Sequence, residues 1–145
     1  MAEFKLDIGD SKTKRTFKLE LKSPDADQLF GKKIGETFRG ELLGLTGFEF
    51  VITGGSDRSG FPMRKDVDGV GRRRLLLEAG TIGLKKVKKF KGIRLKKSIR
   101  GNAISAETAQ VNAKIVKWGS EDLNAKFPPK VKEVKAEAAA APAVA

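Results

Sequence analysis

The chain has 145 residues, of which 30 are Lys or Arg and 18 are Asp or Glu, so its formal net charge at pH 7 is +12. It contains no cysteine and no histidine, which excludes disulfides, thiolate or imidazole zinc sites, and nucleophiles that rely on a histidine base. A positive excess of this size favours a polyanionic partner, above all a nucleic acid.

The first predicted elements are two β-strands near the N-terminus. Apolar and charged residues alternate in EFKLDI (3–8) and again in TFKLELK (16–22), which is the pattern of strands that are buried on one face. The polar stretch between them, GDSKTKR (9–15), predicts a turn and therefore a hairpin. A short helix is predicted in SPDADQLF (23–30), because Ser23 can cap it and the proline that follows suits a first helical turn.

Short strands separated by glycines continue along the chain. The segment 35–55 contains alternating apolar and polar residues between glycines. Three further strand candidates are RRRLLLEAG (72–80), SIRGNAIS (98–105) and AQVNAKIVKWG (109–119). This pattern predicts a mainly β fold, which we expect to be a small, Gly-rich β-barrel-like domain with one or two short helices.

The C-terminal residues differ from the rest of the chain in composition. Residues 128–145 are rich in Ala, Lys and Pro and hold too few large apolar side chains to offset the entropy cost of ordering. We therefore expect a β-rich domain over residues 1–127, followed by a flexible low-complexity tail.

The stretch GGSDRSGFPM (54–63) predicts a tight loop. Its glycines permit positive φ angles, its aspartate can accept hydrogen bonds from nearby backbone, and its proline fixes the direction in which the chain leaves. The residues that we expect to build this structural loop are Gly54, Gly55, Asp57, Gly60, Phe61 and Pro62. A phosphate-binding loop fits poorly, because no Gly-Lys-Ser or Gly-Lys-Thr follows at the required spacing.

Nearly all of the excess charge lies in one basic segment. Residues 72–100 carry twelve basic side chains and one acidic side chain, whereas residues 1–71 have net charge 0 and residues 101–145 have net charge +1. Such crowding raises the free energy of the compact state unless counter-charge is supplied, and a nucleic-acid backbone supplies it most densely. An acidic membrane surface fits less well, because Gly92 interrupts any single amphipathic helix. A merely solvated stretch is the remaining alternative.

Catalysis and membrane insertion are both disfavoured. Asp57 and Asp66 lie nine positions apart with only a loop to relate them, and paired carboxylates act chemically only where they converge. We therefore expect no enzyme, no cofactor, no metal and no small-molecule substrate. No apolar run reaches the roughly 18 residues of a membrane-spanning helix, and the acidic, alternating N-terminus is unlike a signal peptide, so we expect a cytosolic protein.

Three motifs in order resemble a known family. TGGSDRSGFPMRKDV (53–67), GRRRLLLEAG (71–80), and KSIRGNAIS (97–105) leading to NAKIVKWG (112–119) are similar in order and spacing to the archaeal and eukaryotic small-subunit ribosomal protein S6e family. The likeness covers roughly residues 1 to 125. Eukaryotic members carry a long basic C-terminal helix with a phosphorylated serine cluster, whereas this chain ends in Ala and Pro, so it resembles an archaeal member. The resemblance implies a non-catalytic structural component of the small ribosomal subunit in the cytoplasm, bound to rRNA and neighbouring ribosomal proteins.

The resemblance makes the basic segment an RNA-binding candidate. Guanidinium groups can clamp phosphates or stack on unpaired bases, and lysines act as mobile point charges. Alternation in GIRLKKSIRGN (92–102) predicts that the face of Ile93 and Leu95 seats on the domain while Arg94 and Lys96 meet RNA. The candidate RNA-binding residues are Arg72, Arg73, Arg74, Lys85, Lys86, Lys88, Lys89, Lys91, Arg94, Lys96, Lys97 and Arg100. An RNA-binding assembly or chaperone factor, or a DNA-compacting protein, would share this segment, and both stay as alternatives.

Overall fold

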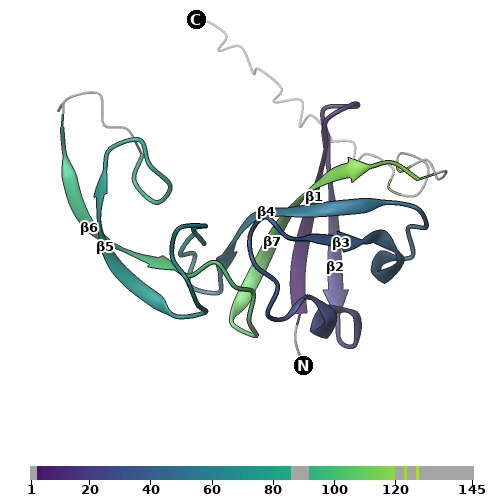
Figure 1. The fold of residues 1–145 in the computed structure, drawn as a ribbon, viewed down its shortest axis with the longest axis horizontal. Coiled ribbons are helices and arrows are strands. Elements are labelled where there is room, and N and C mark those ends of the chain that lie inside the picture. Colours follow the sequence, from purple (N-terminus) through teal and green to yellow (C-terminus); the bar gives the residue numbers. More distant parts are fainter. Residues whose placement is uncertain (1–2, 86–91, 120–122, 124–126, 128–145) are drawn as a thin grey trace, which may run out of the picture.

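The computed structural model describes residues 3–85, 92–119, 123 and 127. Within these residues the fold is mainly β, with two short 3₁₀ helices, as the sequence predicts (Figure 1). In chain order the elements are β1 (Glu3–Asp10), β2 (Arg15–Lys22), η1 (Asp25–Leu29), β3 (Thr37–Arg39), η2 (Gly40–Leu43), β4 (Glu49–Asp57), β5 (Arg72–Glu78), β6 (Arg94–Arg100) and β7 (Thr108–Lys117). The predicted tail, residues 128–145, lies outside the described residues.

Five of the strands form one sheet in the order β2-β1-β7-β4-β3. β1 and β7 run parallel, and the other neighbours are antiparallel. The register of β4 against β7 shifts at three places, and in Figure 1 β4 and β3 cross the direction of β1 and β2, so the sheet is strongly twisted. We call this sheet together with η1 and η2 the body.

The sheet does not close into the expected barrel. Among the described residues, edge strand β2 pairs only with β1, and edge strand β3, which has three residues, pairs only with β4. The open side of the core is covered by the chain around the two 3₁₀ helices, which contributes Ala26, Leu29 and Leu45 to it. The predicted helix is thus the 3₁₀ helix η1, and the Ser23 hydroxyl donates to the Asp27 carboxylate instead of capping it.

The core of the body follows from strand alternation. β1 has alternating exposed and buried residues, and Phe4, Leu6 and Ile8 are all 1% exposed or less. Phe48 and Phe50 stack with their ring centroids 6.1 Å apart, and Phe4 and Phe30 form a separate edge-to-face pair at 5.5 Å. Burying side chains of this size stabilises a fold by about 1.5–3 kcal/mol each, so the body has a substantial core of its own.

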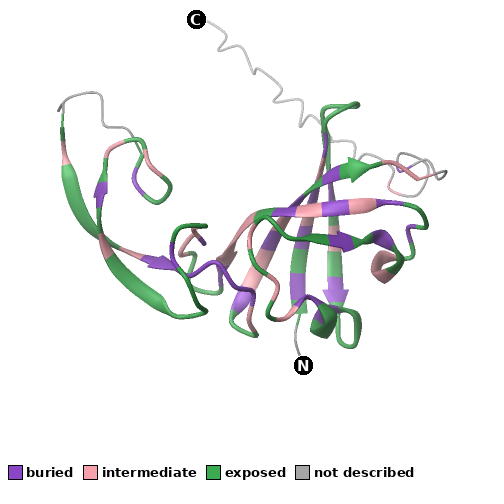
Figure 2. Ribbon diagram, viewed as in Figure 1, coloured by how far each residue is buried: buried purple, intermediate pink, exposed green. Residues whose placement is uncertain are grey.

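The strands β5 and β6 form a separate two-stranded antiparallel sheet. We call this sheet and its described connections, residues 72–85 and 92–100, the arm. The arm extends away from the body in Figure 1, and it is mostly exposed in Figure 2. Among the described residues its buried apolar cluster has three members, Leu77, Leu84 and Ile99, with Leu75 packed against them. None of the helices in the described part of the chain is long and apolar enough to cross a membrane.

Candidate nucleic-acid interface

The arm brings together two basic runs that are about twenty residues apart in sequence. β5 begins with Arg72, Arg73 and Arg74, and β6 contains Arg94, Lys96, Lys97 and Arg100. Their antiparallel register places Arg72 opposite Arg100 and Glu78 opposite Arg94. Lys85 is exposed after the turn that follows β5. The other predicted residues of the segment, Lys86, Lys88, Lys89 and Lys91, lie outside the described residues.

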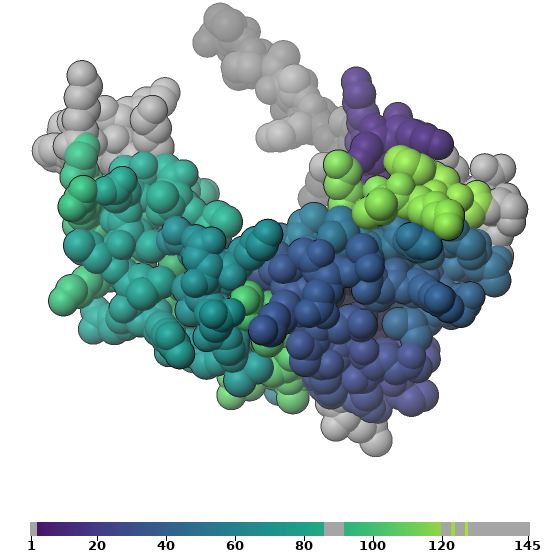
Figure 3. All heavy atoms as spheres, in the orientation of Figure 1, coloured from purple at the N-terminus to yellow at the C-terminus, as the bar shows by residue number. Residues whose placement is uncertain are grey.

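Both faces of the arm are open to solvent at the residues that carry its cations. Three consecutive residues at the start of β5 and four at the start of β6 are exposed, whereas a strand covered on one face alternates, as β1 does. Leu76 and Leu95 point to opposite faces, and they are 58% and 45% exposed. The prediction that the Leu95 face seats on the domain is therefore wrong, because the arm forms a lobe that meets the body only at its base (Figure 3).

The register divides the arm into two faces. Face A carries Arg72, Arg74, Leu76 and Glu78 of β5 with Arg94, Lys96, Ser98 and Arg100 of β6. Face B carries Arg73, Leu75 and Leu77 with Leu95, Lys97 and Ile99. The turn after β5 folds onto face B, because a Cβ atom on Gly83 would lie 3.2 Å from a Leu77 methyl carbon and 3.4 Å from one of Ile99.

The exposed cations of the arm differ in how they are paired. Arg94 Nη2 lies 2.7 Å from Glu78 Oε1 in an exposed ion pair on face A. As far as the chain is described, no acidic group lies within ion-pair distance of Lys85 or of four cations on the two strands: Arg73, Arg74, Lys96 and Lys97. These four side chains are therefore open to an external anion.

Arg100 is not available to an external anion. Its side chain is 2% exposed, and its Nη1 lies 2.9 Å from Glu107 Oε2 and 3.5 Å from Asp57 Oδ2. Its Nη2 donates to the Ser105 hydroxyl. The structure thus places this predicted RNA-binding residue inside the protein, because the last two residues of β6 are buried where the arm joins the body.

Asp57 holds the base of the arm. Its side chain is fully buried, and its Oδ1 accepts the backbone N–H groups of Ser59 and Phe61, both at 2.9 Å. Its Oδ2 accepts Arg72 Nε at 2.7 Å. Arg72 also donates to Ser59 Oγ at 3.0 Å and lies 5.1 Å above the Phe61 ring. One carboxylate therefore joins the end of β4 to the start of β5 and the end of β6.

The pKa of Asp57 reflects this position. Burial by itself raises the pKa of the carboxyl, but hydrogen bonds from the Phe61 and Ser59 backbone, together with the Arg72 guanidinium, hold the pKa below the ordinary value of 3.8. Asp57 is therefore charged at neutral pH, and together with Glu107 it balances the cross-strand pair of Arg72 and Arg100. The sequence predicted only the backbone hydrogen bonds of Asp57. It did not predict its ion pairs, because Arg72 and Arg100 were both interpreted as phosphate-binding residues.

The predicted loop around Asp57 is shorter than expected. Gly54, Gly55 and Asp57 belong to β4, and the chain turns only at residues 58–60. Of the three glycines, only Gly60 has a positive φ, of +80°. Gly55 is needed for another reason, since a Cβ there would lie 2.5 Å from the Gln110 carbonyl oxygen. Pro62 then accepts the Arg100 backbone N–H at 3.0 Å, which ties the turn to β6.

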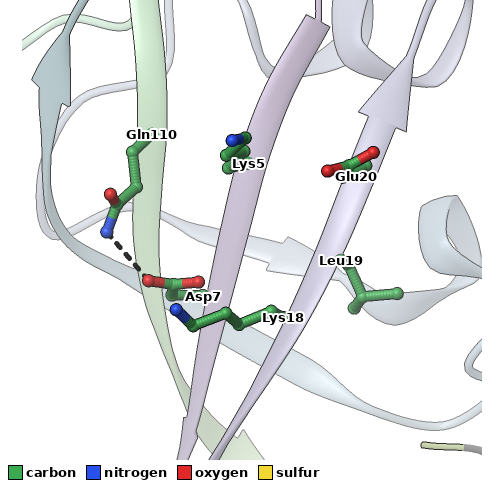
Figure 4. Close-up of a pocket in the computed structure, with 6 residues that line it drawn as sticks. All are labelled: Lys5, Asp7, Lys18, Leu19, Glu20 and Gln110. Carbon is green, nitrogen blue, oxygen red and sulfur yellow. Dashed lines mark hydrogen bonds between the residues drawn. The ribbon is translucent and has the colours of Figure 1, made fainter.

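The outer face of the body offers a contrast. A shallow hollow of about 410 Å³ is lined by Lys5, Asp7, Lys18, Leu19, Glu20 and Gln110 (Figure 4). Lys5 lies opposite Glu20 and Asp7 opposite Lys18 in the register of β1 and β2, and Gln110 Nε2 donates to Asp7 Oδ2 at 2.8 Å. Cations and anions therefore balance locally. The described residues also include no group of three His, Cys, Asp or Glu that could hold a metal ion.

Comparison with known proteins gives a consistent result. The family model described as Ribosomal protein S6e matches residues 4–127. The chain is 41% identical over 143 residues to the small ribosomal subunit protein eS6 of Methanocella arvoryzae, covering 99% of both chains. It is 47% identical over 108 residues to that of Methanosphaera stadtmanae (74% of this chain, 81% of the relative). It is also 43% identical over 124 residues to that of Methanosphaerula palustris (86% and 92%).

Proposed function

Because the chain belongs to the ribosomal protein S6e family, we propose that it is a structural constituent of the small ribosomal subunit and binds rRNA through the exposed cations of its arm. The role is structural and not catalytic, and its place is the ribosome in the cytoplasm. Its partners are small-subunit rRNA and neighbouring ribosomal proteins.

The observation that carries this proposal is the charge of the arm. Arg73, Arg74, Lys96 and Lys97 are exposed and have no acidic partner among the described residues, while the outer face of the body alternates in sign. A lobe that gathers unpaired cations and stands away from its body suits a polyanion that surrounds it. Ribosomal RNA is the polyanion that the family membership favours.

Binding would proceed by exchange of counterions. Each Lys or Arg that meets a phosphate releases condensed cations from the RNA, and this entropy gain drives association. The two exposed arginines can clamp a phosphate with two parallel hydrogen bonds, and the lysines act as point charges. Recognition would follow the shape of the folded RNA more than its bases, because the deep groove of an RNA helix resists side chains. Lys85 and the lysines at 86, 88, 89 and 91 would extend the contact.

Salt dependence tests the proposal. We would measure affinity of the full chain for the small-subunit rRNA of Methanocella arvoryzae, transcribed in vitro, between 50 and 200 mM salt. If six to ten phosphates are neutralised, affinity should fall by roughly 10³ or more. A flat response would contradict the proposal.

A matched pair of variants locates the contact. Replacing Lys85, Lys86, Lys88 and Lys89 by Gln should weaken rRNA binding and leave the circular dichroism spectrum unchanged. The control replaces four exposed lysines of the body, Lys5, Lys18, Lys22 and Lys114, and removes the same charge. Equal losses for both variants would mean that net charge alone, and not the arm, binds RNA.

Sedimentation distinguishes a subunit constituent from an assembly or chaperone factor. A constituent stays with the small subunit in high-salt gradients, whereas a factor that visits rRNA dissociates. Competition with duplex DNA addresses the remaining alternative, because a DNA-compacting protein would prefer the duplex to folded rRNA.

A further inference from the structure

We infer that the arm holds two separate stretches of RNA backbone, one against each of its faces, and so joins two parts of the folded RNA. The inference rests on the proposed function and adds the geometry of binding. It departs from the expectation that one face seats on the body while the other meets RNA.

Exposure of both faces is the first observation. Consecutive residues of β5 and of β6 are exposed, so neither face is covered by the body along these stretches. The following turn covers face B only at Leu77 and Ile99; elsewhere side chains of successive residues leave the sheet in opposite directions into solvent. Each face is therefore an independent surface.

The distribution of unpaired cations is the second observation. Face A holds Arg74 and Lys96, and face B holds Arg73 and Lys97. The two pairs have the same relation in the register: Arg74 faces Ser98, two residues from Lys96, and Arg73 faces Ile99, two residues from Lys97. Each face thus presents one Arg and one Lys as diagonal neighbours on adjacent strands.

Contact of both cation pairs with RNA then needs a phosphate strand on each side of the arm. A strand of RNA backbone along face A neutralises Arg74 and Lys96 but leaves Arg73 and Lys97 uncompensated. The sheet itself and the cluster of Leu77, Leu84 and Ile99 on face B stand between the two pairs. Two phosphate strands, one on each face, satisfy all four cations.

The base of the arm supports this arrangement. Asp57 and Glu107 hold Arg72 and Arg100 in fixed ion pairs, so the arm is anchored where it leaves the body and free beyond that point. A lobe of this kind can enter between two RNA segments, whereas a sheet that lies flat on the body can contact only one.

Directed cleavage tests the two faces separately. The chain has no cysteine, so Leu76→Cys on face A and Leu95→Cys on face B each create a single attachment point for an Fe(II) chelate that generates hydroxyl radicals. Both leucines are substantially exposed. Each labelled full-length protein is bound to Methanocella arvoryzae small-subunit rRNA, and the cleavages are mapped by primer extension.

We expect the two positions to cut different, non-overlapping stretches of rRNA. Cleavage of the same stretch from both positions, or from one position only, would overturn the inference while leaving the proposed function intact. If only one position cuts protein-free rRNA, and the other face forms a protein crosslink in assembled subunits, then that other face contacts a neighbouring protein.

Matched charge removal provides the second test. Arg74→Gln with Lys96→Gln removes two charges from face A, and Arg73→Gln with Lys97→Gln removes the same two from face B. Each variant should lower the slope of log affinity against log salt by roughly 1.4–1.8, at about 0.7–0.9 per cation, and weaken binding on the order of tenfold or more at 0.1 M salt.

The outcomes separate the two proposals. A loss from one pair and none from the other, with both variants folded by circular dichroism, would overturn the two-faced arm. Absence of any salt-dependent binding by the unaltered chain would overturn the proposed function, and the inference with it.

Discussion

The body and the arm are both built from β-strands, but they differ in how their residues are buried and how their charges are paired. In the body, β1 buries every second residue, and opposite charges face each other across β1 and β2, as Asp7 and Lys18 do. In the arm, exposed residues follow one another, and two arginines, Arg72 and Arg100, face each other. The comparison teaches that the body balances its charges through its own contacts, whereas the arm leaves several cations exposed without an acidic partner among the described residues.

The base of the arm shows how the two regions are joined. Like charges directly opposite each other destabilise an antiparallel pair, and here a buried carboxylate from β4 lies within 3.5 Å of both guanidinium groups. Asp57 therefore supplies internally the anion that the outer part of the arm lacks. The cations at the base are held in ion pairs within the fold, and Arg73, Arg74, Lys96 and Lys97 beyond it are exposed.

The largest expected effect contrasts the two cores. Phe50 is fully buried in the body, and Phe50→Ala should lower the free energy of unfolding by about 3–5 kcal/mol, because it removes a large side chain from a packed core. Leu77 is equally buried but belongs to a cluster of three. Leu77→Ala should cost about 2 kcal/mol, the low end of such changes, and act within the arm.

Urea unfolding and native-state hydrogen exchange measure these two changes. Leu77→Ala should speed exchange in β5 and β6 and leave β1 and β7 protected. Equal acceleration in both regions would show that arm and body unfold as one unit.

The next effect concerns the joint. Asp57→Ala leaves Arg100 buried with the exposed Glu107 as its one remaining acidic partner among the described residues, and we expect a loss of about 3 kcal/mol. This is the low end for breaking a buried ion pair, because Arg72 keeps access to water. The control is Asp66→Ala, which removes an exposed carboxylate paired with Arg64 at 2.9 Å and should cost at most about 1 kcal/mol. Similar losses in urea unfolding for both variants would refute the anchoring role.

Acid should weaken the joint through the same carboxylate. Since the pKa of Asp57 is held below 3.8 in the folded chain, its stabilising contribution is complete above that pH and is lost as the pH falls through the lowered folded value. Asp10 in the body also has a lowered pKa, so both regions lose stability in acid. Hydrogen exchange of β5 and β6, measured as the pH is lowered, reports the acid dependence of the arm. Asp57→Asn should remove this dependence. Unchanged acid sensitivity of the arm in this variant would contradict the assignment.

The smallest effect lies on face A near the end of β5. Glu78→Gln releases Arg94 from its exposed ion pair, and an exposed pair contributes only about 0.2–1 kcal/mol. The free energy of unfolding should therefore change little, while rRNA affinity at low salt should rise a few-fold because one more cation becomes available. A fall in affinity would indicate that Glu78 itself takes part in binding, for instance by orienting Arg94.

Much of the fold could be predicted from local pattern. The alternation in 3–8 and 16–22 gives β1 and β2 with the expected buried face, and the glycine-punctuated segments become β3, β4 and β7. The open sheet could not be predicted in this way, because closure depends on which strands become edges. The parallel pairing of β1 with β7 joins residues about a hundred positions apart, and periodicity does not report such distances.

The candidate site divides in the same manner. The charge of residues 72–100 and the exposure of Arg73, Arg74, Lys96 and Lys97 follow from a run of cations that no core can absorb. The burial of Arg100 could not be foreseen, since its neighbours in sequence resemble those of the exposed arginines. It is buried because Asp57, 43 residues earlier, reaches it across the base of the arm.

The sequence by itself therefore determined the strand content and the location of the excess charge, because both depend on residues close together along the chain. Only the tertiary structure decided which of the described cations are ion-paired within the fold, and that both faces of the arm carry exposed cations. Such pairings depend on where strands from distant parts of the chain meet, and Coulomb interactions act through that spatial distance and not through separation in sequence.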